Sequence, residues 1–204
     1  MMHKKFHSVF AVMIALLALF ITVPRVVHAE YNRMSNIAQV NRPVLNTPLV
    51  MWLNHLDLLP GDSSVQTSFT AVSSMVGGLS GLNIQSTTTG DIGIQGGNKV
   101  VEMGVPTIPG YTIIGVRVCY ELSDPRSFIT QIRLAQLQNP PSSALVMLDD
   151  GTDFVNKGPV CVTSAATSID PQKGAVRLSL RLNFGSTSDV IVVRGIGLVL
   201  KPKS

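Results

Sequence analysis

The chain has 204 residues, of which 45% are hydrophobic and only 14% are charged. A chain of this length fits one domain better than two, and its apolar content can fill a substantial core. Soluble proteins usually carry about 25% charged residues, and helices need many of them on their exposed faces. The low charge and the abundance of Gly, Ser, Thr, Val and Ile therefore favour an all-β fold.

The formal net charge of +4 comes largely from the N-terminal region. Lys4, Lys5 and Arg25 lie in a segment that we expect to be removed, and without these three the 16 basic residues fall to 13, against 12 acidic residues. The remaining basic residues are spread singly along the chain. A nearly neutral chain without a basic run lacks the charge that binds polyanions, so we expect no nucleic-acid partner.

The N-terminus has the pattern of a secretory signal peptide. Two lysines precede an apolar run from Ser8 to Val23, and Val27-His28-Ala29 supplies small residues before a cleavage point. We predict cleavage after Ala29, and therefore a secreted, periplasmic or extracellular protein. The alternative is an uncleaved anchor, but the run is shorter than the ~20 residues that cross a bilayer. We expect no membrane span after cleavage.

Residues 30–63 are predicted to form an N-terminal arm or linker. Pro43 and Pro48 favour extended backbone before them. A compact apolar segment follows at Leu49–Leu53 and holds the only tryptophan, Trp52. We interpret this segment as a first strand or short helix that covers the core, because apolar runs of this length are ordinarily buried.

Two later stretches alternate apolar and polar residues with the period of a β-strand. They are Ile113–Leu122 and Val176–Phe184. The run Phe128–Leu137 fits a strand or a loose helical face, and its β-branched residues favour a strand. The residues predicted to face the core are Ile114, Val116, Val118, Tyr120 and Leu122 in the first stretch and Val176, Leu178, Leu180, Leu182 and Phe184 in the second.

Short strands separated by turn residues recur from Val65 to Leu200. This pattern predicts a single antiparallel β-sandwich or jelly-roll-like domain of about eight strands at residues 64–204, after a signal peptide at 1–29 and the arm at 30–63. In architecture the run from Ile113 to Leu200 resembles secreted jelly-roll and carbohydrate-module-like sandwiches. A shared architecture does not specify a function.

The chain contains two cysteines, Cys119 and Cys161. An even cysteine count behind an export signal indicates a disulfide. Both residues occupy the outward phase of their predicted strands, flanked by apolar residues that face inward. We predict that Cys119 and Cys161 form a disulfide bond.

Catalytic patterns are scarce in the sequence. After cleavage His55 is the only histidine, so a nucleophile activated by histidine or a His/Cys zinc site lacks residues. No glycine-rich phosphate loop stands between a strand and a helix. We therefore expect no catalytic activity and no required cofactor.

The one cluster of carboxylates is Asp149-Asp150-Gly151-Thr152-Asp153. Asp149, Asp150 and Asp153 supply hard oxygen ligands of the kind Ca²⁺ prefers, and we keep them as a candidate calcium site. The alternative is an ordinary turn, because Asp-Gly is itself a strong turn signal. A glycosidase pair would have to come from Glu102, Glu121 and these three aspartates.

Three functional hypotheses remain open. The first is an exported, non-catalytic β-sandwich that binds a partner or assembles, its partner being a surface glycan, another protein or another copy of itself. The second is a carbohydrate-binding module, which the small number of tryptophans and tyrosines disfavours, because sugar platforms usually display several such rings. The third is a secreted hydrolase that uses carboxylates alone.

Overall fold

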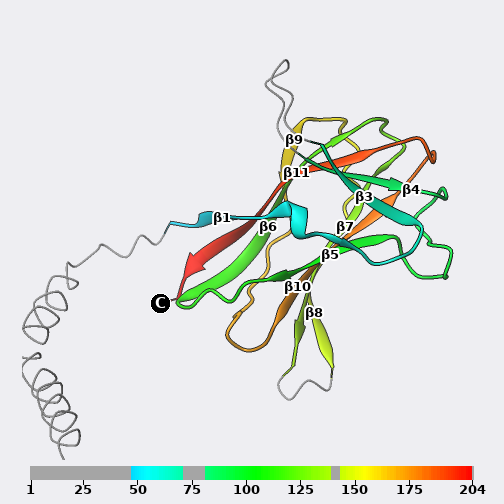
Figure 1. Ribbon diagram of the computed structural model, residues 1–204. Coiled ribbons are helices and arrows are strands. Elements are labelled where there is room, and N and C mark those ends of the chain that lie inside the picture. Colours follow the sequence, from blue (N-terminus) through cyan, green and yellow to red (C-terminus); the bar gives the residue numbers. More distant parts are fainter. Residues whose placement is uncertain (1–46, 71–80, 139–142, 204) are drawn as a thin grey trace, which may run out of the picture. The chain divides into compact units, whose positions relative to one another are not determined.

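The computed structural model describes residues 47–70, 81–138 and 143–203 (Figure 1). The predicted signal peptide and the first part of the predicted arm lie outside the described residues. Within the described ranges the chain forms strands and one short 3₁₀ helix, η1 (His55–Asp57). No helix in these ranges is long and apolar enough to cross a membrane.

The strands form two antiparallel sheets. Sheet A has the order β3-β4-β11-β6-β9, with β1 also paired to β11, and sheet B has the order β2-β5-β10-β7-β8. Sheet A contains β1 (Leu49–Leu53), β3 (Val65–Thr70), β4 (Gly81–Ser86), β6 (Tyr111–Leu122), β9 (Val160–Thr163) and β11 (Ile191–Pro202), and sheet B contains β2 (Leu59–Pro60), β5 (Val100–Val105), β7 (Phe128–Leu137), β8 (Ala144–Asp150) and β10 (Val176–Asn183).

The strand order is that of a jelly roll. If the eight strands from β4 to β11 are numbered 1 to 8, their order is 1-8-3-6 in sheet A and 2-7-4-5 in sheet B. Consecutive strands of this set therefore lie in different sheets, except β7 and β8, which form a hairpin in sheet B. The prediction of an all-β, antiparallel sandwich is confirmed.

The segment 49–60, which we assigned to the arm, contributes a strand to each sheet. β1 pairs with the Ile196–Leu200 part of β11, on the edge that β4 occupies further along the same strand. β2 pairs with β5 through Leu59 and Pro60. The compact apolar segment at 49–53 is therefore a strand of sheet A, and it lies beside β11 in Figure 1.

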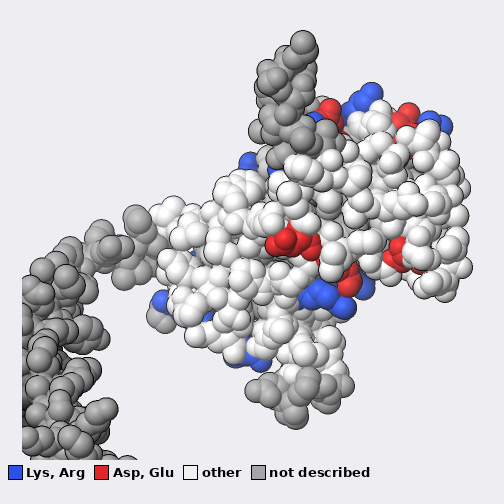
Figure 2. Space-filling view, in the orientation of Figure 1, with Lys and Arg blue, Asp and Glu red and all other residues white. Residues whose placement is uncertain are grey.

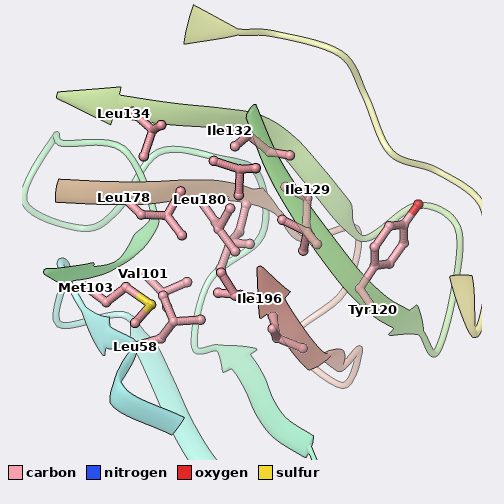
Figure 3. Packing of buried hydrophobic residues seen from close by; sticks show 14 of the residues in the cluster. Leu58, Val101, Met103, Tyr120, Ile129, Ile132, Leu134, Leu178, Leu180 and Ile196 are labelled. Carbon is pink, nitrogen blue, oxygen red and sulfur yellow. The ribbon is translucent and has the colours of Figure 1, made fainter. Parts of the chain in front are cut away.

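The core lies between the two sheets. In β10 the predicted alternation holds, since Leu178, Leu180 and Leu182 are fully buried while Arg177 on the opposite face is exposed. Figure 3 shows side chains of both sheets, among them Ile132 of sheet B and Ile196 of sheet A, meeting in one cluster. Apolar inner faces that interdigitate in this way supply most of the stability of a sandwich.

The predicted inward orientation of Ile114 is wrong. Near the start of β6 the side chain of Ile113 is fully buried, whereas that of Ile114 is only partly buried. The pairing with β11 passes from Gly115–Val199 to Ile113–Leu200, so that Ile114 is skipped. This β-bulge shifts the alternation by one residue, while Val116, Val118, Tyr120 and Leu122 keep the predicted inward orientation.

The disulfide prediction is confirmed. Cys119 and Cys161 lie directly opposite each other in the antiparallel pair β6–β9, with their Cα atoms 3.9 Å apart, and their sulfur atoms are bonded. Both side chains are on the outer face of sheet A, since Val118 and Tyr120 on either side of Cys119 are buried. The bond therefore ties the edge strand β9 to the central strand β6.

Candidate functional site

The outer face of sheet B carries a concave site that we call the polar hollow. It has a volume of about 490 Å³ and is lined by Asp91, Phe128, Thr130, Gln131, Gly151, Asp153, Arg181 and Asn183. Arg181 and Asn183 lie on the face of β10 opposite to the buried Leu180 and Leu182. Most of the lining is polar and faces away from the core.

A bulge in β7 shapes the floor of the hollow. Gln131 pairs with Arg181, but the next pair joins Ile129 to Leu182, so Thr130 has no partner residue in β10. Bulges of this kind bend a strand and redirect a side chain, and they are common beside functional sites. Here the bulge places Thr130 in the hollow between Gln131 and Phe128.

Two loops form the walls of the hollow. The loop after β4 is bridged to the end of β10 through Gly90 and Phe184, which brings Asp91 beside Arg181, and the two side chains form an ion pair. The loop after β8 is bridged to β7, where Phe154 N donates to Ile129 O at 2.9 Å. This second contact lays Gly151 and Asp153 along the opposite side.

Lys99 holds the first of these loops in place. Its side chain is fully buried, and its Nζ donates to the carbonyl oxygens of Thr88, Thr89 and Gly90 at 2.5, 2.8 and 3.0 Å. Burial lowers the pKa of the Lys99 ammonium, and the carboxylates of Asp62 and Asp91 oppose that shift. These hydrogen bonds hold the backbone immediately before Asp91, which lines the hollow.

Two polar atoms of the lining residues are shielded from solvent without a hydrogen-bond partner in the described part of the chain. They are Thr130 Oγ1 and Arg181 Nε. An unsatisfied buried polar group costs about 1–3 kcal/mol, and such groups in native proteins call for an explanation. Both atoms belong to residues that line the hollow.

The three aspartates of the candidate calcium site do not converge. Asp149 accepts from Gln131 Nε2 at 2.6 Å and pairs with Arg133 at 3.1 Å, whereas Asp150 accepts from Thr152 and from Ala165 N. Only Asp153 lines the hollow. In the described ranges no group of three or more His, Cys, Asp or Glu side chains is placed to hold a metal ion, and the calcium site stays a prediction from the sequence.

The carboxylates considered for a glycosidase pair are also separated. Glu102 pairs with Arg177 at 3.3 Å on sheet B, whereas Glu121 pairs with Arg194 on sheet A. Asp150 faces a different set of partners, described above, and has a lowered pKa, because its hydrogen bonds outweigh the effect of burial. A glycosidase acid needs a raised pKa and a second carboxyl across a cleft. His55, in η1, is not among the lining residues of the hollow.

Sequence reasoning missed most of the hollow. It singled out Asp153, but not Asp91, Thr130, Arg181 or Asn183. Asp91 and Arg181 are 90 residues apart in the chain and meet only because β10 and the loop after β4 are bridged. No local pattern signals such a pair, and the bulge at Thr130 leaves no recognisable mark in the sequence.

Charge on the molecule is sparse and mixed. Figure 2 shows basic and acidic side chains scattered over the face in view, most of which carries neither. In the hollow the Arg181–Asp91 pair is neutral, and Asp153 is exposed with no ion-pair partner among the described residues. This site offers no excess of positive charge to an anionic ligand.

No family model matches the sequence, and no curated protein matches it. Among its structural neighbours are carbohydrate-binding modules. A xylan-binding domain of family CBM22 aligns over 70% of this chain and 86% of its own with a TM-score of 0.44 and 10% identity. The CBM22-1–GH10 part of xylanase 10B from Clostridium thermocellum, complexed with xylohexaose, aligns over 78% of this chain and 28% of its own, with a TM-score of 0.46 and 11% identity.

A further neighbour is the carbohydrate-binding module CBM36 in complex with calcium and xylotriose. It aligns over 74% of this chain and 98% of its own, with a TM-score of 0.38 and 11% identity. Likenesses at this level concern the arrangement of strands and say nothing about a ligand of this chain.

Proposed function

We propose that this protein is a non-catalytic binding module whose polar hollow takes a neutral glycan. The observation that carries the proposal is the set of polar side chains around the hollow, two of which hold polar atoms without partners. A sugar hydroxyl is at once a donor and an acceptor, so it can satisfy both the guanidinium of Arg181 and the hydroxyl of Thr130.

The other lining residues suit the same class of ligand. Asp91 and Asp153 are acceptors, Gln131 and Asn183 carry both donors and acceptors, and Phe128 adds an aromatic surface. Binding sites for small molecules typically combine a few convergent polar groups with apolar walls. The remaining carboxylate charge at Asp153 disfavours an anionic ligand, which is why we propose a neutral glycan.

One feature of the hollow supports a binding role without catalysis. Hydrolysis of a glycoside uses a pair of carboxyl groups at a defined separation. In the hollow Asp91 is neutralised by Arg181, which leaves Asp153 alone. We therefore expect the protein to retain glycans without cleaving them, and to act outside the cytosol if the leader is cleaved as its sequence predicts.

The test is retention on a panel of neutral polysaccharides (xylan, glucan, mannan and galactan) by depletion and affinity electrophoresis. Thr130→Val should weaken retention several-fold and leave the melting temperature unchanged or raised, because an unpartnered buried hydroxyl becomes a methyl group of the same shape. Arg181→Ala should weaken retention about tenfold or more, since charged hydrogen bonds are worth about 1.5–3 kcal/mol.

Arg177→Ala is the matched control. Arg177 lies on the same face of the same strand, four residues away, and is also ion-paired, but it does not line the hollow. Equal losses in Arg177→Ala and Arg181→Ala would contradict the proposed site. Release of reducing ends would indicate a hydrolase instead, and self-association without retention would return us to the assembly hypothesis.

A further inference from the structure

Trp52 lies on the outer face of sheet A, which the polar hollow does not reach. It stands opposite Gly197 in the β1–β11 pair, and 56% of its surface is exposed. A Cβ atom built at Gly195 would lie 3.3 Å from Trp52 Cζ3, and one built at Gly197 would lie 3.2 Å from Trp52 Cε3. The indole therefore rests on the backbone of two glycines, and its other side is open.

A small groove runs beside the ring. It has a volume of about 270 Å³ and is lined by Trp52, Cys119, Tyr120, Pro159, Val160, Cys161, Arg194 and Gly195. We call Trp52, its glycine support and this groove the Trp52 platform. The disulfide forms part of the lining, so the strand β9 that completes the groove is covalently tied to β6.

The ion pair at the platform, Arg194 with Glu121, carries no net charge. Arg194 lines the groove and its guanidinium binds the carboxylate of Glu121, with Nε 2.9 Å from Oε2. The pair presents donors and acceptors side by side without net charge. A charged ligand therefore gains little here, whereas a neutral ligand with hydroxyl groups can form hydrogen bonds with Arg194, the member of the pair that lines the groove.

The size and shape of the platform narrow the ligand further. Sites for drug-sized molecules usually measure about 300–1,000 Å³, so this groove has room for a single ring. An exposed indole offers a flat apolar surface with a large contact area, which suits the apolar face of a pyranose whose hydroxyls then reach Arg194. We propose that the Trp52 platform is a second glycan site that binds one sugar ring.

The ligand class rests on the proposed function, but the position of the site does not. The hollow and the platform are on the outer faces of different sheets, so one molecule can engage two glycan segments. Two weak sites on one module raise the apparent affinity for an insoluble or multivalent glycan above that of either site alone. This arrangement predicts stronger retention on polysaccharides than affinity for short oligosaccharides.

The experiment uses the fact that Trp52 is the only tryptophan of the chain. The full-length protein and its Arg181→Ala variant are titrated with the hexasaccharides of xylose, glucose and mannose, and emission and acrylamide quenching are recorded. At least one hexasaccharide should change the emission saturably and reduce quenching in both proteins. Unchanged emission and quenching at concentrations that saturate binding by calorimetry would overturn the proposal.

Substitutions give a second readout. Trp52→Ala should reduce retention on the polysaccharide about tenfold or more, and Trp52→Phe should restore part of it. Phe69→Ala is the control, because Phe69 belongs to the same sheet and is exposed to a similar extent, 58%. Equal losses in Trp52→Ala and Phe69→Ala would also overturn the proposal.

The two proposals fail in different ways. If Trp52 responds while Thr130→Val and Arg181→Ala retain the glycan normally, the hollow is not the main site and the platform stands. If the hollow variants lose retention while Trp52 stays silent, the platform alone is refuted. If no polysaccharide or hexasaccharide binds, both proposals are wrong.

Discussion

Asp149 and Asp150 are neighbours in the chain with different surroundings. Asp149 is exposed and pairs with Arg133, while only 8% of Asp150 is exposed and it accepts from Thr152 N, Thr152 Oγ1 and Ala165 N at 3.1, 2.7 and 2.7 Å. Burial opposes the ionised form of Asp150, but these hydrogen bonds outweigh it and lower the pKa. The same residue type therefore has a surface role at one position and a structural role at the next.

Asp150→Asn should destabilise the protein at neutral pH by about 1–3 kcal/mol, because hydrogen bonds to a carboxylate are lost. A carboxyl whose pKa is lowered on folding contributes stability that is present above the unfolded pKa, about 3.9, and is lost as the pH falls through the folded pKa. The difference between wild type and variant should therefore shrink below about pH 4. Urea unfolding at pH 7, 5 and 3 measures this difference in the free energy of unfolding.

Asp149→Asn is the control for this comparison. Its pair with Arg133 is largely exposed, and exposed ion pairs contribute about 0–1 kcal/mol. If the two variants lost equal stability at neutral pH, the structural role assigned to Asp150 would be wrong. A difference in unfolding free energy between Asp150→Asn and wild type that stayed constant down to pH 3 would also contradict this role.

Single residues were predictable where burial decides their place. The alternation in β10 identified Leu178, Leu180 and Leu182 as core residues, because one-sided burial leaves a period-two pattern in the sequence. The partners of Asp149 and Asp150 were not predictable, because each is tied to a residue from a different part of the fold, and Asp153 lines the hollow instead. Proximity in the chain suggested one shared site where there are three separate environments.

At the scale of elements, bulges and bridged loops account for the differences from the sequence prediction. A bulge removes one residue from the pairing without changing composition or hydrophobicity, as at Ile114 in β6 and Thr130 in β7. The strands themselves were predictable, since their apolar faces must be covered. The position of the loop that carries Asp91 was not predictable, because it depends on hydrogen bonds from one buried lysine to three backbone carbonyl oxygens, which leave no pattern in the sequence.

Lys99→Met tests that loop. Methionine keeps the length of the side chain, but it removes the donor from the carbonyls of Thr88, Thr89 and Gly90. We expect the free energy of unfolding to fall by about 2–4 kcal/mol, because buried acceptors lose a charged donor. We also expect weaker glycan retention, because Asp91 is no longer held beside Arg181. Thermal unfolding and amide exchange of residues 87–91 measure the two effects.

Lys173→Met provides the comparison, since Lys173 is exposed and its replacement should change stability by no more than about 0.5 kcal/mol. Equal behaviour of the two variants would show that the ammonium of Lys99 does not organise the loop. Retention that survived in Lys99→Met, with amide exchange in the loop increased, would show instead that the hollow does not need Asp91 in a fixed position.

For the whole molecule, the jelly roll brings distant segments to both outer faces. The polar hollow combines residues from 91 to 183, and the Trp52 platform combines residues from 52 to 195. Antiparallel strands that cross between sheets place such segments side by side without any local motif. This explains why composition and periodicity predicted the sandwich, whereas neither candidate site could be located in the sequence.

The disulfide and the leader make a joint prediction for the whole chain. If the leader directs export, the protein from the exported fraction should begin at Glu30 and carry the Cys119–Cys161 bond. The bond closes a loop with a sequence separation of 42 residues, for which the chain-entropy model gives a stabilisation of about 4 kcal/mol. Intact mass gives the N-terminus, and thiol titration in denaturant, without reductant, should find no free thiol.

Reduction should lower the midpoint of urea unfolding in the wild type but leave a Cys119→Ser/Cys161→Ser double variant unchanged, because that variant has no bond to break. Two titratable thiols in exported protein would contradict the oxidising destination that the leader predicts. Cys119 and Cys161 also line the Trp52 platform. Reduction should therefore diminish the response of Trp52 emission to hexasaccharide while retention through the polar hollow persists, since the hollow lies on the other sheet.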